Sequence, residues 1–218
     1  MKERPILFSA PMVRAILDGR KTQTRRVIKG QDLWGDFIVS HRQIEPGVFR
    51  MDGAEPINAA MHGNDRTFID VRAPYGQPRD QLWVRETIEL RTIPGNSFPS
   101  PVYAADGAHV MDGENKASNH EFMRRRVHPS IHMPRWASRI LLEITDVRVE
   151  RLQDISYADA QAEGWNPLAD DGRNPNPLDP RAWYRHLWES INGPGSWDAN
   201  PWVWAIGLRV LKNKKKAA

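Results

Sequence analysis

Patterns typical of β-strands are scattered along the whole chain, with short helical patterns between them. The clearest strand covers residues 139–150, whose second half alternates apolar and polar side chains, and residues 202–211 are expected to form a buried closing strand. Further strands are expected over residues 5–9 and 81–90. Strands and helices in this irregular order do not fit a doubly wound parallel sheet. The sequence therefore predicts an α+β fold, a small mixed β-barrel with short flanking helices and long loop insertions.

Three short helices are expected from residues that commonly start or end helices. The first begins after Ser9 and ends before Gly19. The second begins after Ser156, in a variant of the capping box, and ends before Gly164. The third begins after Asp179, and its apolar residues recur every four positions, which indicates one buried face.

The length of 218 residues favours one domain that carries large insertions. Two stretches, 30–75 and 92–125, have weak periodicity and many loop-forming residues, so they are interpreted as long loops, with room for one hairpin in the first and a short strand in the second. We expect a single domain over residues 1–211, followed by a basic disordered tail over 212–218.

The positive charge of the chain is unevenly distributed. The net charge is +4, but four lysines lie in the tail, so the rest of the chain carries 27 residues of each sign. Cations gather over residues 14–29, whereas acidic residues collect over 143–163. The early basic cluster is therefore a better candidate for anion binding than the tail.

The chain contains no cysteine, which excludes disulfides, thiolate catalysis and cysteine-based zinc sites. This composition is typical of a reducing cytoplasm. No apolar stretch approaches the roughly 18 residues of a membrane-spanning helix. We expect a cytoplasmic protein with no membrane partner and no cofactor.

The densest group of functional residue types is GRKTQTRR at residues 19–26, directly after the first expected helix. Four of these eight residues are cations, and their mutual repulsion is unfavourable unless solvent or an anion relieves it. An anion site is one interpretation, and a solvated basic edge strand is the other.

The segment 19–26 resembles the Gly-x-Lys-x-x-Thr-x-Arg signature of the ASCH family. The segments DQLWVRE (80–86), SIHMPRWASR (130–139) and NPWVW (200–204) are similar to its longer, phage- and prophage-borne members. The resemblance implies a PUA-like barrel with a central cleft for RNA or a nucleoside. In small bacterial members that hydrolyse N4-acetylcytidine, a Lys and a Thr of the signature act with a Glu from a later helix. By position, the resemblance implies the catalytic residues Lys21, Thr24 and Glu163.

In amide hydrolysis, Thr24 would attack the acyl carbon after Lys21 has taken its proton. Because a free lysine titrates near ~10.4, this role at neutral pH needs a pKa about 2–3 lower. Burial and neighbouring arginines lower the pKa of Lys21, whereas a close Glu163 raises it, and the sequence leaves the sum open. The candidate substrate- or RNA-binding residues are Arg20, Arg25, Arg26, Arg85, Glu86 and His132.

The position of Glu163 carries an independent signal. A carboxylate at the end of a helix is unfavourable by about 0.3–1 kcal/mol, unless solvent or a cation compensates for it. We expect Lys21 as that cation, and an exposed Glu163 on a frayed turn is the alternative. Lys21 and Thr24 would point to opposite faces of a regular strand, so they converge only if Lys21 lies in the turn after Gly19 or a bulge intervenes.

Other residue patterns are interpreted as structural. His128 and His132 are four apart, but the prolines beside them exclude the helix that would bring both to a metal, so no metal site is expected and His132 is expected to line the cleft. For the tryptophans at 183, 188, 202 and 204, core packing is favoured over base stacking. Trp83 is also assigned to the core. The arginines 124–126 are expected in a solvated loop.

Three functions are compatible with these residues. The leading hypothesis is an amidohydrolase that acts on a modified pyrimidine nucleoside. The alternatives are a non-catalytic RNA-binding module, with single-stranded RNA in the same basic cleft, and a ribonuclease whose cations stabilise a phosphorane. An RNA binder would lose affinity steeply with salt, whereas a nucleoside enzyme would not.

Overall fold

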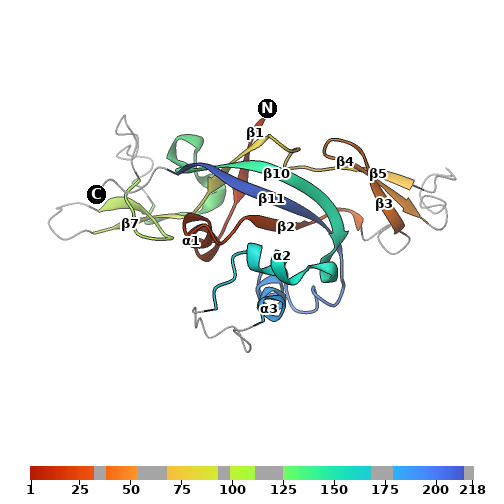
Figure 1. Cartoon of the computed structure of the whole chain (residues 1–218). Coiled ribbons are helices and arrows are strands. Elements are labelled where there is room, and N and C mark those ends of the chain that lie inside the picture. The colour runs from red at the N-terminus through yellow and green to blue at the C-terminus, as the bar shows by residue number, and fades with distance from the viewer. Residues whose placement is uncertain (32–37, 54–67, 93–98, 111–124, 168–178, 214–218) are drawn as a thin grey trace. The chain divides into compact units, whose positions relative to one another are not determined.

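The computed structural model describes residues 1–31, 38–53, 68–92, 99–110, 125–167 and 179–213 (Figure 1). The protein is α+β, with many more strands than helices. It folds as two compact units, each made of separate segments. The first unit comprises Met1–Gly19, Asp80–Glu143 and Arg209–Ala218, and the second comprises Arg20–Arg79 and Ile144–Leu208.

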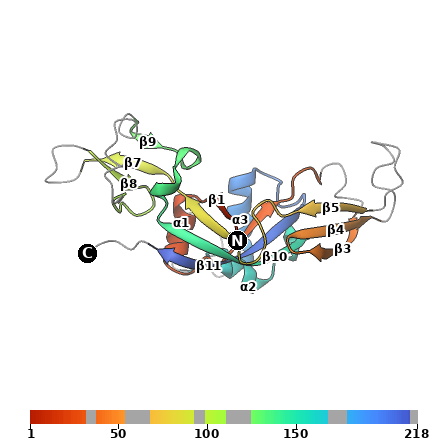
Figure 2. The same ribbon diagram turned by 90° about the horizontal axis from the view of Figure 1, so that it is seen from above.

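The first unit contains the helix α1 (Ala10–Leu17) and two groups of paired strands. Strand β6 (Gln81–Arg85) pairs in parallel with β1 (Glu3–Leu7) and antiparallel with the start of β10 (Ile140–Arg151). In the second group, β7 (Ile88–Arg91) lies between β8 (Ser100–Tyr103) and β9 (Val127–His128), as Figure 2 shows. Helix α1 begins after Ser9 and is followed by Gly19, whose φ of +75° favours glycine, as the sequence predicted.

The single strand expected over residues 81–90 is in fact two strands, β6 and β7. The chain leaves the ladder at Glu86 and Thr87, between the two strands. The carboxylate of Glu86 is buried there and receives two hydrogen bonds of 2.9 Å from Arg139. This buried ion pair lies at the break between the two strands.

In the second unit, β2 (Gln23–Val27) pairs antiparallel with β11 (Trp202–Asn213), which is hydrogen-bonded to β10. Strand β11 continues two residues beyond the expected end at 211, so the first two residues of the expected tail belong to it. Residues 214–218 lie outside the described part of the chain. Gly207 of β11 lies so close to β10 that a Cβ atom would be 2.5 Å from Thr145 Oγ1, so a larger residue would not fit there without a shift.

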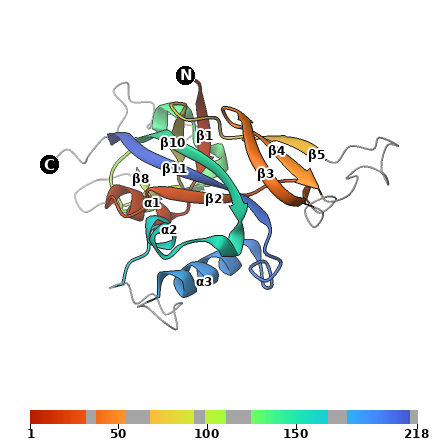
Figure 3. The same ribbon diagram turned by 45° about the vertical axis from the view of Figure 1, so that its right-hand side comes forward.

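Strands β3 (Ile38–Glu45), β4 (Val48–Gly53) and β5 (Phe68–Arg72) form a separate antiparallel sheet (Figure 3). This sheet lies in the stretch 30–75, where long loops with one hairpin were expected. One of its faces buries Phe49 and Met51, and the Phe49 ring packs edge-on against Trp204 with 5.6 Å between centroids. The opposite face carries ion pairs such as Arg50–Asp70, at 2.8 Å.

The other two predicted helices are confirmed as α2 (Tyr157–Ala162) and α3 (Pro180–Asn192), which lie side by side in Figures 1 and 3. Their core contains Leu152, Ile155, Ala160, Tyr184, Trp188, Trp197 and Val203, with Trp183 partly buried against it. The tryptophans at 188, 202 and 204 are buried, so their core assignment is confirmed.

None of the sheets in the described residues closes on itself, so a closed barrel is not seen. Within the same residues, every helix is too short or too polar to cross a membrane.

Candidate functional site

The segment that carries Lys21 lies against the end of helix α2. Lys21 comes before β2, outside its regular ladder, and forms an isolated bridge with the backbone of Glu163. Next to it, the Thr22 amide donates to the Ala162 carbonyl at 2.8 Å. The turn at Gly19 therefore places Lys21 outside the regular strand. This is one of the two arrangements in which Lys21 and Thr24 were expected to be able to converge.

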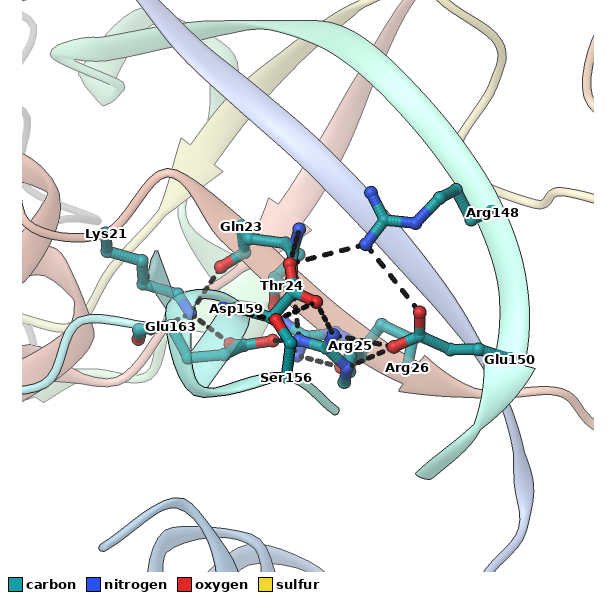
Figure 4. A network of polar contacts seen from close by, with 10 residues as sticks. All are labelled: Lys21, Gln23, Thr24, Arg25, Arg26, Arg148, Glu150, Ser156, Asp159 and Glu163. Carbon is teal, nitrogen blue, oxygen red and sulfur yellow. Dashed lines mark hydrogen bonds and ion pairs between the residues drawn. The ribbon is translucent and has the colours of Figure 1, made fainter. Parts of the chain in front are cut away.

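The ammonium of Lys21 and the carboxylate of Glu163 form a buried ion pair (Figure 4). Lys21 Nζ donates to Glu163 Oε2 at 2.7 Å and to two carbonyls, those of Gln23 at 2.8 Å and Glu163 at 3.0 Å. The exposed fractions of the two side chains are 0% and 2%. The expected cation beside Glu163 is thus Lys21, and the alternative of an exposed Glu163 is wrong.

Burial lowers the pKa of Lys21 below its ordinary value. The charge of Glu163 and its hydrogen bond oppose this effect, whereas the positive charges of Arg26 and Arg25 add to it. Because the ammonium has no access to solvent, the loss of hydration outweighs the gain from the carboxylate. The direction that the sequence left open is therefore downward, which makes Lys21 a better base at neutral pH than a free lysine.

A second buried cation, Arg25, binds the other oxygen of Glu163. Arg25 Nη1 donates to Glu163 Oε1 at 3.1 Å and to Gln23 Oε1 at 2.7 Å, and Arg25 Nε donates to Glu150 Oε1 at 2.7 Å. Its side chain is fully buried. This differs from the expected role in binding substrate or RNA, because carboxylates of the protein itself occupy the guanidinium.

Thr24 lies on the opposite face of β2. Gln23 and Arg25 point toward the carboxylates, and the alternation of a strand turns Thr24 and Arg26 the other way. Among the described residues, the Thr24 hydroxyl accepts a hydrogen bond of 3.1 Å from Arg26 and is bonded to neither Lys21 nor Glu163. The structure thus brings two of the three predicted catalytic residues into direct contact and leaves the third paired with Arg26.

The polar network extends to Asp159 and Arg148, as the dashed lines in Figure 4 show. Asp159 receives hydrogen bonds from Gln23, at 3.0 Å, and from the Ser156 hydroxyl, at 2.8 Å. Arg148 lies 3.4 Å from Asp159 and 3.6 Å from Glu150. Gln23, Glu150 and Asp159 are members of the site that were not predicted from the sequence. The acidic cluster over 143–163 was the signal that could have found the two acids.

The remaining cations of the segment 19–26 are more accessible. Arg20 is half-buried and donates to the Gly164 carbonyl at 2.7 Å. Arg26 is also half-buried, and it donates to the carbonyl of Arg25 as well as to Thr24. Both arginines keep part of their surface open to solvent.

The other predicted binding residues, Arg85, Glu86 and His132, belong to the first unit. Arg85 donates to the carbonyls of Met133, at 3.1 Å, and Ile131. His132 is exposed in a short 3-10 turn, and Glu86 is engaged in the pair with Arg139. The described contacts of these three residues do not include the Lys21–Glu163 pair.

The core position expected for Trp83 is wrong. Trp83 and Arg85 share one face of β6, with the guanidinium 5.4 Å from the ring centre. The buried residues of this strand are Leu82 and Val84, which point the other way. Trp83 is only half-buried.

Within the described ranges, no group of three or more His, Asp or Glu side chains is arranged to hold a metal ion. The first of the arginines 124–126 lies outside the described residues, and the other two are exposed. The Lys21–Glu163 pair and its neighbours bring together a buried amine, carboxylates, a hydroxyl and guanidinium groups. No family model matches the chain, and no match was found among curated proteins or solved structures.

Proposed function

We propose that this chain is an ASCH-type protein with a PUA-like fold, and that it hydrolyses the exocyclic amide of N4-acetylcytidine or a similar acylated pyrimidine nucleoside. The observation that carries this proposal is the buried Lys21–Glu163 pair, at 2.7 Å. Burying two charges costs several kcal/mol per ion, so such a pair adds little stability over apolar packing. A buried lysine with a lowered pKa beside a charged partner is typical of a functional site.

The proposed reaction begins with Thr24. Its Oγ1 forms a bond to the acetyl carbon, and its proton moves to the neutral amine of Lys21. The bond from the acetyl carbon to N4 then breaks, and the leaving nitrogen receives that proton. Water hydrolyses the resulting ester on Thr24 to acetate and the free hydroxyl.

This sequence of steps requires the start of β2 to rearrange when substrate binds, so that the Thr24 hydroxyl leaves Arg26 and reaches Lys21 from the other face of the strand. Catalytic hydrogen bonds commonly tighten only in the substrate complex. Arg26, released from Thr24, would then bind the acetyl oxygen, where negative charge develops. Glu163 holds Lys21 in place throughout.

The burial of two cations favours the nucleoside hydrolase over the RNA-directed alternatives. Binding of an RNA backbone draws its affinity from solvent-accessible cations that replace counterions. In the segment 19–26, Lys21 and Arg25 are instead enclosed by the protein's own carboxylates. Only Arg20 and Arg26 remain partly accessible there, which suits one carbonyl or phosphate better than a long RNA strand.

The test is incubation of the pure protein with N4-acetylcytidine and related acylated pyrimidine nucleosides, with product release followed by chromatography. We expect hydrolysis by the wild type, loss in Lys21→Ala and Thr24→Ala, and no change in Lys29→Ala, where an exposed lysine is removed. If the wild type releases nothing from any of these nucleosides but binds single-stranded RNA, the hydrolase proposal is overturned.

A further inference from the structure

We propose that Arg25 is a positioning residue of this site, which holds Glu163 as an anion so that the proton of Lys21 can leave without neutralising the carboxylate. This inference rests on the proposed function and names a further residue of the same site. Nothing in the ASCH-like signature marks this position, because Arg25 stands between the Thr and the Arg of the signature.

The two carboxylate oxygens of Glu163 are divided between two cations. Lys21 Nζ binds Oε2 at 2.7 Å, and Arg25 Nη1 binds Oε1 at 3.1 Å. All three side chains are buried, with exposed fractions of 0% for both cations and 2% for the carboxylate. Glu163 therefore has one partner that can lose a proton and one that cannot, because a guanidinium stays charged.

A buried Lys–Glu pair without further help holds its proton tightly, because loss of the proton would leave the carboxylate charged and buried with no cation beside it. Arg25 lowers this cost, since it still compensates the Glu163 carboxylate after Lys21 has become neutral. The neutral amine can then accept a proton from the nucleophile.

Arg25 is itself held in place by other groups. Its Nε donates to Glu150 Oε1 at 2.7 Å, and its Nη1 donates to Gln23 Oε1 at 2.7 Å. Its guanidinium carbon lies 5.8 Å from the centre of the Tyr184 ring. Because its nitrogens bind Glu163, Glu150 and Gln23, Arg25 acts through Glu163 and not on the substrate.

Arg148 provides a matched control. It carries the same charge and approaches two of the same carboxylates, Glu150 at 3.6 Å and Asp159 at 3.4 Å. Its ion pairs among the described residues do not include Glu163, and its side chain is 42% exposed. Removing Arg148 therefore changes the charge of the network while leaving both contacts of the Glu163 carboxylate intact.

The experiment compares the wild type with Arg25→Gln, Arg25→Lys and Arg148→Gln. The first readout is the pH profile of kcat/KM for N4-acetylcytidine. The second is the NMR titration of the Lys21 amine in protein with labelled lysine, assigned by the signal lost in Lys21→Arg. The second readout needs no activity. An inactive wild type would therefore overturn the proposed hydrolase, while the Lys21 titration would still test the role of Arg25.

In Arg25→Gln, the acidic limb of the profile and the Lys21 titration should both move to higher pH. The rate at pH 7 should fall about tenfold or more and recover toward alkaline pH, since the base is then protonated at neutrality. Arg25→Lys, which keeps the charge, should restore most of the wild-type profile, and Arg148→Gln should leave it in place. An Arg25→Gln protein that loses the same factor at every pH, with an unmoved Lys21 titration, would overturn the inference.

If Arg25→Gln does not fold, the wild type decides the question. The side-chain carboxyl carbon of Glu163, followed by NMR, should report an anion across the whole pH range in which Lys21 loses its proton. A carboxyl signal of the neutral acid at a pH where the amine is also neutral would overturn the inference, because Arg25 would then have failed to hold the charge.

Discussion

The carboxylate of Glu163, the C-cap residue that follows α2, lies 2.7 Å from the ammonium of Lys21, although 142 positions separate the two residues in sequence. Their backbones also meet, in an isolated bridge. The contact therefore does not depend on two long side chains reaching across solvent. The pairing of the main chain determines where the charges lie, and this makes the pair a good target for energetic tests.

Removal of Glu163 from the Lys21–Glu163 pair should strongly destabilise the protein. Breaking a buried ion pair on one side costs about 3–5 kcal/mol when the other charge stays buried without compensation. Glu163→Gln should lower the free energy of unfolding in urea by roughly that amount. Lys21→Met should cost less, because Arg25 still binds Glu163, and the double variant should lose less than the sum.

The control is the exposed pair Arg209–Glu143, at 2.9 Å, in which the arginine side chain is 64% exposed. Arg209→Met should change the free energy of unfolding by less than about 1 kcal/mol. Equal effects in the buried and the exposed pair would contradict the geometry described for Lys21 and Glu163.

The lowered pKa of Lys21 predicts how stability changes with pH. Between this lowered pKa and the ordinary value of 10.5, the unfolded chain binds more protons than the folded protein. The free energy of unfolding should therefore rise with pH across that window, up to the ordinary value. The measurement is urea unfolding at several pH values from about 7 upward, with Lys21→Met as reference, since the subtraction cancels other titrating groups. A wild type that loses stability relative to Lys21→Met as pH rises would mean that the pKa is raised.

The ends of α2, and with them the position of Glu163, could be predicted from the sequence because nearby capping residues determine them. Ser156 marks the start of α2, and Gly164 directly follows its C-cap residue, Glu163. The sequence therefore left two defined alternatives for Glu163, either exposed to solvent or paired with a cation. The pairing of Lys21 with Glu163 was then expected from the resemblance and is confirmed.

The contacts that depend on strand register could not be predicted. Gln23 and Arg25 join the site because β2 turns alternate side chains toward α2, and the sequence does not show which alternate set faces the helix. The separation of Thr24 from Lys21, in contrast, had been raised by the alternation of a regular strand, and the structure shows it. The sheet of β3, β4 and β5 was missed because its buried face is carried by few side chains, chiefly Phe49 and Met51.

The caps of two helices should differ in energetic importance. Ser156 Oγ accepts a hydrogen bond from the Asp159 amide at 3.0 Å, whereas the side chain of Ser9 makes no such bond at the start of α1. Ser156→Ala should therefore lower the free energy of unfolding by about 1 kcal/mol, and Ser9→Ala should change it little. Both variants can be compared by thermal and urea unfolding, and equal losses would contradict the cap assignments.

The last prediction separates a threonine nucleophile from a water nucleophile. Thr24→Val keeps the shape of the buried side chain but removes the hydroxyl that Arg26 binds. If Thr24 attacks the acetyl carbon, kcat for N4-acetylcytidine should fall at least about a hundredfold, since both the nucleophile and its proton transfer are lost. Thr24→Ser, which keeps a hydroxyl, should retain measurable kcat and accumulate the acetyl ester in mass spectra taken during turnover. Hydrolysis at the wild-type rate by Thr24→Val would instead assign the attack to water activated by Lys21, and the Thr24–Arg26 pair would then serve binding alone.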